Sequence, residues 1–256
     1  MATERLINVS YPPVFSALHI LVLGSSLLVY NTQHIIKWQH YTFGLHRSMR
    51  GWYFVFFTMG IIMVAGSLFF LPASILITCI ILSLFTFTYS WPLLPFGQRR
   101  RLREYGWLKI LVLAGVWTIV TSILPILYYH RRITDYPFEI FLRFSFIFSL
   151  CMIFDIRDMQ TDSGSNISTL PNKVGIANSY RVINAALILF VLLSIAQYVH
   201  YSEPDRLIGA ILTAVATRLV AGYLKTHSSG KAYLILADGM MMLYALLILL
   251  PLNKFR

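Results

Sequence analysis

Eight apolar stretches, each close to the length that crosses a lipid bilayer, constrain this chain more than any other feature. A membrane-spanning helix needs about 20 mostly apolar residues, and only helices or closed barrels satisfy their backbone hydrogen bonds in lipid. We therefore predict an all-α bundle of about eight transmembrane helices, forming one domain over residues 1–256. The expected spans are Val14–Tyr30, Trp52–Phe70, Ala73–Tyr89, Leu108–Tyr128, Phe138–Phe154, Ser179–Val199, Leu207–Gly222 and Ala232–Leu250.

Composition and charge agree with an integral membrane protein. The chain is 57% hydrophobic and only 12% charged, which is typical of membrane proteins and not of soluble domains. The net charge is +11, but the basic residues are spread over many short loops, so nucleic acid is not an expected partner. Most Lys and Arg residues fall on one set of alternate loops, and such loops face the cytoplasm. We expect a multi-pass protein of the cell membrane with both termini on the opposite side.

Three aspartates gather near the end of the fifth expected span, in a chain that has only 10 acidic residues. Asp155, Asp158 and Asp162 follow the spacing D-x-x-D-x-x-x-D, which puts all three on one face of a helix and Arg157 roughly opposite. Three carboxylates on one face repel each other, and a bound cation removes the repulsion. Oxygen ligands suit Mg²⁺, which typically bridges carboxylates to phosphates. A solvated acidic helix end is the plainer alternative; ionisable groups near the membrane favour the metal site.

The same segment resembles the second aspartate-rich motif of the UbiA superfamily of intramembrane prenyltransferases, of the 4-hydroxybenzoate polyprenyltransferase type. The aspartates are followed by "TLPNKVG", where the family commonly has Gly-x-x-Thr-Leu-Pro, and Asn166 occupies the glycine position. "FTYSWPLLPFGQRRRL" and the apolar helix after it also look similar. The resemblance implies helices around a central cavity, in which Mg²⁺ carries a prenyl diphosphate and an aromatic or other lipophilic acceptor is alkylated. Asp158 and Asp162 are then the principal catalytic ligands.

The first aspartate motif of that family, N-D-x-x-D, is not matched. At the corresponding stretch, "YNTQHIIKWQH", Asn31 is kept, whereas Thr32 and Ile35 stand in place of the aspartates. His34 lies close to the face of Asn31 and is a polar substitute for metal or diphosphate, with interfacial polar filler as the alternative. The motif also ends the first expected span, where the family carries it on the second. We expect that the family's first helix is absent, through a truncated start or divergence.

Several other residues are candidates for the diphosphate or the acceptor. Arg forks suit phosphate oxygens, although the run "GQRRRLREYG" also serves orientation and lipid headgroups. Asp238 lies well inside the last expected span, where it is either a buried carboxylate paired with Arg218 or a hydroxyl, or a group that binds the acceptor. Besides Asn31 and His34, the candidates for diphosphate binding are Tyr89, Ser90, Arg100, Arg101 and Lys173.

The sequence thus predicts Mg²⁺-dependent transfer of an isoprenyl group from a prenyl diphosphate to a lipophilic acceptor. Two other functions stay open. A non-catalytic membrane protein that binds isoprenoid diphosphates accounts for the missing first motif. A small transporter needs polar residues at mid-bilayer in several helices, and only Asp238, Arg218 and Arg143 approach that position.

Overall fold

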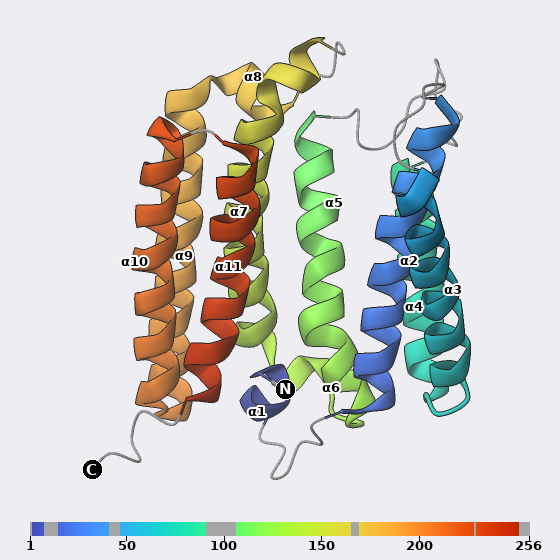
Figure 1. Cartoon of the computed structure of the whole chain (residues 1–256). Coiled ribbons are helices and arrows are strands. Elements are labelled where there is room, and N and C mark those ends of the chain that lie inside the picture. The colour runs from blue at the N-terminus through green and yellow to red at the C-terminus, as the bar shows by residue number, and fades with distance from the viewer. Residues whose placement is uncertain are drawn as a thin grey trace.

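The computed structural model describes residues 2–7, 15–40, 47–90, 106–164, 169–227 and 229–250 of the chain. Every regular element in these ranges is helical, as predicted (Figure 1). In chain order the elements are α1 (Ala2–Leu6), α2 (Ala17–His40), α3 (Arg47–Leu68), α4 (Ala73–Ser90), α5 (Gly106–Thr118), a π-helical turn (Ile119–Ile123), α6 (Leu124–Tyr128), a 3₁₀ turn (Ile133–Asp135), α7 (Pro137–Gly164), α8 (Leu170–Val174), α9 (Ile176–Tyr201), α10 (Pro204–Thr226) and α11 (Gly230–Leu249).

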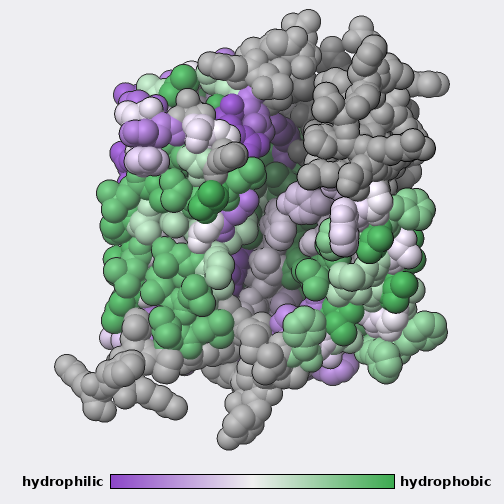
Figure 2. Space-filling view, viewed as in Figure 1, coloured by the Kyte–Doolittle hydropathy of each residue, from purple (hydrophilic) through white to green (hydrophobic). Residues whose placement is uncertain are grey.

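Each of the eight expected spans corresponds to one long helical segment. Six segments of the described chain are long and apolar enough to cross a membrane on their own: Gly51–Leu68, Gly106–Tyr128, Pro137–Met159, Ile176–Tyr201, Pro204–Thr226 and Ala232–Leu249. The other two, Ala17–Thr32 in α2 and Ala73–Thr86 in α4, are shorter apolar segments. Hydrophobic residues cover the flank formed by α9, α10 and α11, whereas polar residues gather at its upper end (Figure 2).

The long helices run alternately up and down, so the short helices mark two opposite ends of the bundle (Figure 1). We call them the α8 end and the α1 end. The last turns of α7, which carry the aspartates, reach the α8 end, and the last turn of α11 lies at the α1 end. The aspartates are therefore remote from α1 and from the end of α11. Which end faces the cytoplasm stays a prediction from the distribution of basic residues.

Helix α7 is the centre of the bundle and packs against α5, α9 and α11. Its inward face is almost fully buried, including Leu142, Phe146 and Leu150. The Phe146 ring lies 5.3 Å from the Phe190 ring and 5.2 Å from the Tyr244 ring, between centroids, which joins α7, α9 and α11 through aromatic contacts. This packing fixes α7, and with it the aspartates, relative to its neighbours.

Two glycines bring α2 and α3 into close contact. A Cβ atom added at Gly60 would lie 3.0 Å from the Gly24 carbonyl oxygen, and one added at Gly24 would lie 2.9 Å from Met63 Cβ. Small residues at such crossings let the backbones of membrane helices approach. The outer faces of α3 and α4, and the turn between them, carry exposed large hydrophobic side chains that suit contact with lipid: Trp52, Phe54, Ile62, Phe69, Phe70, Ile77 and Ile80.

Candidate functional site

Asp155 is buried between α5 and α7 and forms an ion pair with Lys109. The side chain is only 3% exposed, and its Oδ1 atom lies 2.7 Å from Lys109 Nζ. Lys109 comes from the first turn of α5, so the ion pair crosses from one helix to its neighbour. Since a buried charge is costly without an opposite charge nearby, each residue needs the other in this position.

Asp158, one turn further along α7, is partly exposed and pairs with Arg157. Arg157 Nε lies 2.6 Å from Asp158 Oδ1, and Nη2 lies 3.0 Å from Oδ2, which is a bidentate arrangement. The expectation that Arg157 points away from the aspartates is therefore wrong. Its side chain is long enough to bend back toward Asp158, with the guanidinium 5.1 Å from the centre of the Phe154 ring.

Asp238 is exposed, and among the described residues it forms neither a hydrogen bond nor an ion pair with Arg218 or with a hydroxyl group. The expectation of a buried, paired carboxylate is therefore wrong. Asp238 on α11 instead interacts electrostatically with Arg157 of α7. This interaction places Asp238 near the Arg157–Asp158 pair, at the same end of the bundle. Its role toward an acceptor stays a prediction.

Asn31 and Thr32 point back to their own helix. Asn31 is buried, and its Nδ2 donates a hydrogen bond to the Leu27 carbonyl oxygen at 2.7 Å. Thr32 Oγ1 donates to the Leu28 carbonyl oxygen, also at 2.7 Å. These bonds use one of the two Asn31 amide hydrogens and the Thr32 hydroxyl hydrogen, so they leave one amide hydrogen and the side-chain oxygen of Asn31 outside them.

Of the remaining candidates for binding diphosphate or metal, the structure describes the side chain of Lys173 but not those of the others. Lys173 is exposed on the short helix α8, where Asn172 Nδ2 donates to the Met159 carbonyl oxygen of α7 at 3.5 Å. Arg100 and Arg101 lie outside the described residues. The helices containing His34, Tyr89, Ser90 and Asp162 are described, but the side chains of these four residues are not.

The aspartates fit a metal ion only in part. Within the described residues no three His, Cys, Asp or Glu side chains lie close enough together to hold one. Asp155 would have to leave Lys109, whereas Asp158 is accessible and needs only a turn of the Arg157 side chain. Asp162 follows Asp158 at the i+4 position of α7, on the same face. Asp158 is therefore the described aspartate of α7 that is most accessible to a metal ion, and Mg²⁺ binding by Asp158 with Asp162 stays a prediction.

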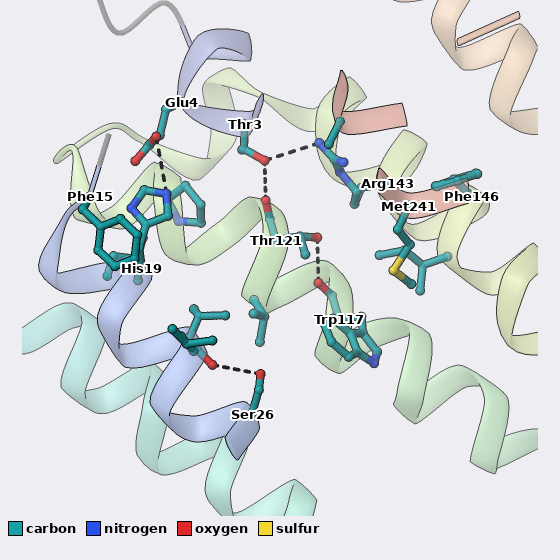
Figure 3. A pocket seen from close by; sticks show the side chains of 17 residues that line it. Thr3, Glu4, Phe15, His19, Ser26, Trp117, Thr121, Arg143, Phe146 and Met241 are labelled. Carbon is teal, nitrogen blue, oxygen red and sulfur yellow. Dashed lines mark hydrogen bonds and ion pairs between the residues drawn. The ribbon is translucent and has the colours of Figure 1, made fainter. Parts of the chain in front are cut away.

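A pocket of about 500 Å³ lies nearer the other end of the bundle, next to α1 (Figure 3). Its walls come from α2, α5, α7 and α11, and they are mostly apolar. The lining residues are Thr3, Glu4, Phe15, Leu18, His19, Val22, Leu23, Ser26, Trp117, Val120, Thr121, Pro125, Arg143, Phe146, Ile147, Met241 and Ala245. We call it the α1 pocket. Arg143 precedes Asp155 by 12 residues on α7, so the pocket floor and the aspartates are about 18 Å apart along the helix.

The α1 pocket is closed at its base by the N-terminal helix. Thr3 donates a hydrogen bond to the Thr121 carbonyl oxygen and accepts one from Arg143 Nη2 at 3.3 Å (Figure 3). The Thr121 carbonyl is available because Pro125, four residues later, has no N–H to donate. The helix widens there into the π-helical turn Ile119–Ile123, a feature that is frequent at functional sites.

Glu4 forms the second polar contact of α1. It is 1% exposed, accepts a hydrogen bond from the Tyr129 hydroxyl at 2.9 Å, and lies 3.8 Å from His19 Nε2. Burial and the Glu4 carboxylate raise the pKa of Tyr129, so the phenol remains a protonated donor. Arg143 Nη2 in turn lies 2.7 Å from Glu139 Oε1, an i,i+4 ion pair within α7.

Sequence reasoning missed Lys109, the partner of Asp155, and the polar residues of the α1 pocket. Lys109 is one charge in an apolar run, "GWLKILVLAG", and a charge inside a membrane span is the signal that could have singled it out. Thr3, Glu4 and His19 gave no such signal, because their contacts join segments far apart in the sequence.

The comparisons with known proteins establish a similarity of fold. No family model and no curated protein matches the chain. The fold is similar to the solved structure of a digeranylgeranylglyceryl phosphate synthase in membranes, with a TM-score of 0.56 and 14% sequence identity. The match covers 91% of this chain and 82% of that chain. At this level of identity the similarity concerns the arrangement of the helices.

Proposed function

We propose that this protein transfers an isoprenyl group from a prenyl diphosphate to an aromatic or other lipophilic acceptor within the membrane, as a divergent UbiA-type prenyltransferase. The observation that carries the proposal is the cluster of Asp155, Asp158, Lys109 and Arg157 on neighbouring helices. It lies in a bundle whose fold resembles that of a membrane prenyltransferase over 91% of the chain. The fold alone does not carry a function; the charged cluster supplies the chemistry.

The cations of the cluster suit an anionic leaving group. Lys109 and Arg157 both lie at carboxylates near the α8 end, and Arg157 offers a planar fork of donors that matches phosphate oxygens. A diphosphate that binds beside them gains charge-assisted hydrogen bonds. Lys173 on α8, together with Arg100 and Arg101, extends the positive charge that we expect around the diphosphate.

We assign different parts to the three aspartates. Asp158 and Asp162 are proposed to hold Mg²⁺, which when bound would supply positive charge to the leaving diphosphate. Asp155 is proposed to keep the Lys109 ammonium in place between α5 and α7, because its Oδ1 atom is already 2.7 Å from Nζ. The apolar interior of the bundle excludes water from the reacting allylic group.

A non-catalytic protein that binds isoprenoid diphosphates is the second candidate. It is favoured by the pairing of the described aspartates of α7: Asp155 and Asp158 each have a basic partner. Asn31 and Thr32, at the position of the unmatched first motif, donate to their own helix. Such a protein binds the diphosphate without breaking the C–O bond.

Diphosphate release separates the two candidates. The full chain, purified in detergent, is incubated with a panel of prenyl diphosphates and lipophilic aromatic acceptors, with Mg²⁺ or with chelator. A transferase releases diphosphate and forms a prenylated product only when Mg²⁺ is present. Binding of a prenyl diphosphate without any release, in folded protein, establishes the non-catalytic function instead.

A further inference from the structure

Arg218 places a positive charge on the outer side of the spanning helix α10, and the proposed transfer reaction does not use it. Its side chain is exposed, and so are the large apolar side chains of Val215 and Leu219 beside it. Arg218 precedes Thr226, the last residue of α10, by eight residues, which is about 12 Å along the helix. Charged side chains within membrane spans are costly and usually mark a functional site. The position of Arg218 therefore indicates a ligand on the outer surface of the bundle.

The Arg218 side chain extends along α10 toward the α8 end. A Cβ atom added at Gly222 would lie 3.5 Å from Arg218 Nη1, so the guanidinium reaches the level of Gly222, one turn closer to that end. Glycine has no side chain and leaves this space open. Long basic side chains on membrane helices bend in this way to bring their charge to the headgroup region. The guanidinium is therefore placed to meet a polar group at the edge of the apolar layer.

Lys225 brings a second positive charge to the same edge of α10. It follows Arg218 by seven residues, close to two turns, so both side chains leave the helix in nearly the same direction. Lys225 Nζ lies 5.7 Å from the centre of the Tyr180 ring on α9, and Arg218 interacts electrostatically with the same tyrosine. The opposite edge of α10 faces α11, where a Cβ atom at Gly209 would lie 3.4 Å from Leu247 Cβ. Tyr180, Arg218 and Lys225 thus follow the contact between α9 and α10, which we call the α9–α10 seam.

Helices α8, α9 and α10 bring no acidic residue to the α8 end. Within residues 163–237 the acidic residues are Glu203 and Asp205 alone, and both lie where α10 begins, at the α1 end (Figure 1). Arg218 lies 13 residues beyond Asp205, about 20 Å along α10. Among the described residues neither Arg218 nor Lys225 forms a hydrogen bond or an ion pair. The two helices that form the seam therefore do not balance its positive charge.

The aspartates near the α8 end lie on α7 and α11, whereas the seam lies between α9 and α10. Asp155 and Asp158 each have a basic partner, and Asp238 interacts electrostatically with Arg157. Asp162 follows Asp158 on α7. The principal neighbours of α10 are α9 and α11, not α7. The seam is therefore a basic site apart from the proposed diphosphate site.

The surroundings of the two cations decide which anion fits. The guanidinium fork of Arg218 matches phosphate oxygens, and Lys225 adds a second charge. On the side away from the α8 end, Val215 and Leu219 offer exposed apolar surface, which a free phosphate would leave uncovered. We infer that the α9–α10 seam binds an anionic membrane lipid, with its phosphate at Arg218 and Lys225 and its acyl chains along the outer face of α10. Basic sites between membrane helices bind anionic headgroups in this way.

Native mass spectrometry tests this inference, because it counts the lipids bound to each protein. The full chain in detergent, without prenyl diphosphate or Mg²⁺, is titrated with dioleoylphosphatidylglycerol, which is anionic, and with dioleoylphosphatidylcholine, which is zwitterionic. We expect the first phosphatidylglycerol to bind about tenfold more tightly than phosphatidylcholine, because two basic residues favour the net negative headgroup. Glycerol 3-phosphate carries a phosphate without acyl chains and should not displace the lipid, even in large excess.

Variants then locate the lipid phosphate. Arg218→Gln should weaken binding of the first phosphatidylglycerol about tenfold, the value of a charge-assisted hydrogen bond. Gly222→Leu keeps every charge but competes for the space into which the guanidinium bends, so a similar loss is expected. Arg181→Gln is the matched control and should bind like the parent protein. Arg181 is exposed at the same end, donates to Asn178 Oδ1 at 3.0 Å, and leaves α9 about 100° away from Tyr180. Thermal unfolding verifies that each variant is folded.

The inference is overturned if phosphatidylcholine binds as tightly as phosphatidylglycerol, or if Arg218→Gln binds phosphatidylglycerol like the parent protein. An equal loss in Arg181→Gln would show general attraction to the basic surface and also overturns it, as does displacement by glycerol 3-phosphate. Asp158→Asn should bind the lipid like the parent protein, and a loss there would place the lipid at the diphosphate site instead. Diphosphate release is a separate measurement, so failure here is distinguishable from failure of the proposed transferase activity.

Discussion

Lys109 on α5 and Asp155 on α7 form a 2.7 Å ion pair inside the bundle, with side chains 16% and 3% exposed. The ion pair links α5 to α7 near the α8 end of the bundle, where the other aspartates of α7 lie. It also gives one of the three predicted metal ligands an internal cation. Among the described residues, Asp155 and Asp158 therefore each have a basic partner before any ligand binds.

Removing one member of this pair should destabilise the protein. Lys109→Met leaves the buried Asp155 carboxylate without its cation, and we expect a loss of about 3 kcal/mol in the free energy of unfolding, the scale for breaking a buried pair. Denaturant titration in mixed micelles measures it. The double variant Lys109→Met with Asp155→Leu should recover most of the loss. Arg206→Gln, in a more exposed pair, should cost less than about 1 kcal/mol. Equal losses in the two single variants would contradict the role of the buried pair.

The contact between α2 and α3 predicts opposite outcomes at two glycines of one helix. Gly60→Ala places a Cβ atom 3.0 Å from the Gly24 carbonyl oxygen, so the helices must separate. Overpacking of this kind costs about 1–3 kcal/mol. Nothing lies within 4 Å of a Cβ atom at Gly66, so Gly66→Ala should be neutral or stabilise the helix by up to about 1 kcal/mol. Thermal unfolding of the two variants in the same detergent compares them. A Gly60→Ala protein as stable as the parent would refute the close contact.

The fold could be predicted from sequence because spanning helices are long and apolar. The ends of helices were harder to predict. The span Phe138–Phe154 is part of the longer helix Pro137–Gly164, since the polar turns that carry the aspartates continue the helix beyond its apolar portion. Hydropathy reports burial in lipid, and it stops being informative where the chain leaves the apolar layer.

For each ion pair of the candidate site, only the acidic residue could be predicted from the sequence. Asp155 and Asp158 were found because they are rare acidic residues at a regular spacing. Their partners Lys109 and Arg157 were not, because pairing depends on which helices become neighbours and which rotamers they adopt. The α1 pocket shows the same limit: Thr3 meets Arg143 across 140 residues of chain, and no local pattern specifies such a contact.

The joint between α8 and α9 should depend on Gly175. Its φ of +82° and ψ of 158° lie in a region open essentially to glycine alone. Gly175→Ala should cost about 1–3 kcal/mol and shift α8, with Lys173, relative to α7. The free energy of unfolding and the affinity for a prenyl diphosphate should both decrease. Gly230→Ala, where a Cβ atom meets nothing within 4 Å, is the matched control. Equal stability and equal affinity of the two variants would argue against backbone strain in Gly175→Ala.

The Glu4–Tyr129 hydrogen bond should hold α1 against the bundle. Tyr129→Phe removes the donor and leaves a buried carboxylate without that partner, so we expect a loss of about 1–3 kcal/mol. Limited proteolysis at the N-terminal segment should become faster. Tyr136→Phe is the control, because the Tyr136 hydroxyl donates to the Ile7 carbonyl oxygen over a longer 3.4 Å. Unchanged proteolysis in Tyr129→Phe would show that α1 is held by other contacts.

The central claim is that the aspartates of α7 serve prenyl transfer, and Asp158→Asn tests it most directly. Asp158 is partly exposed, with 38% of its side chain accessible, so the substitution should leave the unfolding temperature nearly unchanged. We measure Mg²⁺-dependent diphosphate release from the best prenyl diphosphate donor of the panel. The account predicts release by the parent protein and a loss of about a hundredfold or more in Asp158→Asn, because several kcal/mol of charge stabilisation disappear. Release that is unaffected by Asp158→Asn, or no release by the folded parent with any donor and acceptor, would contradict it.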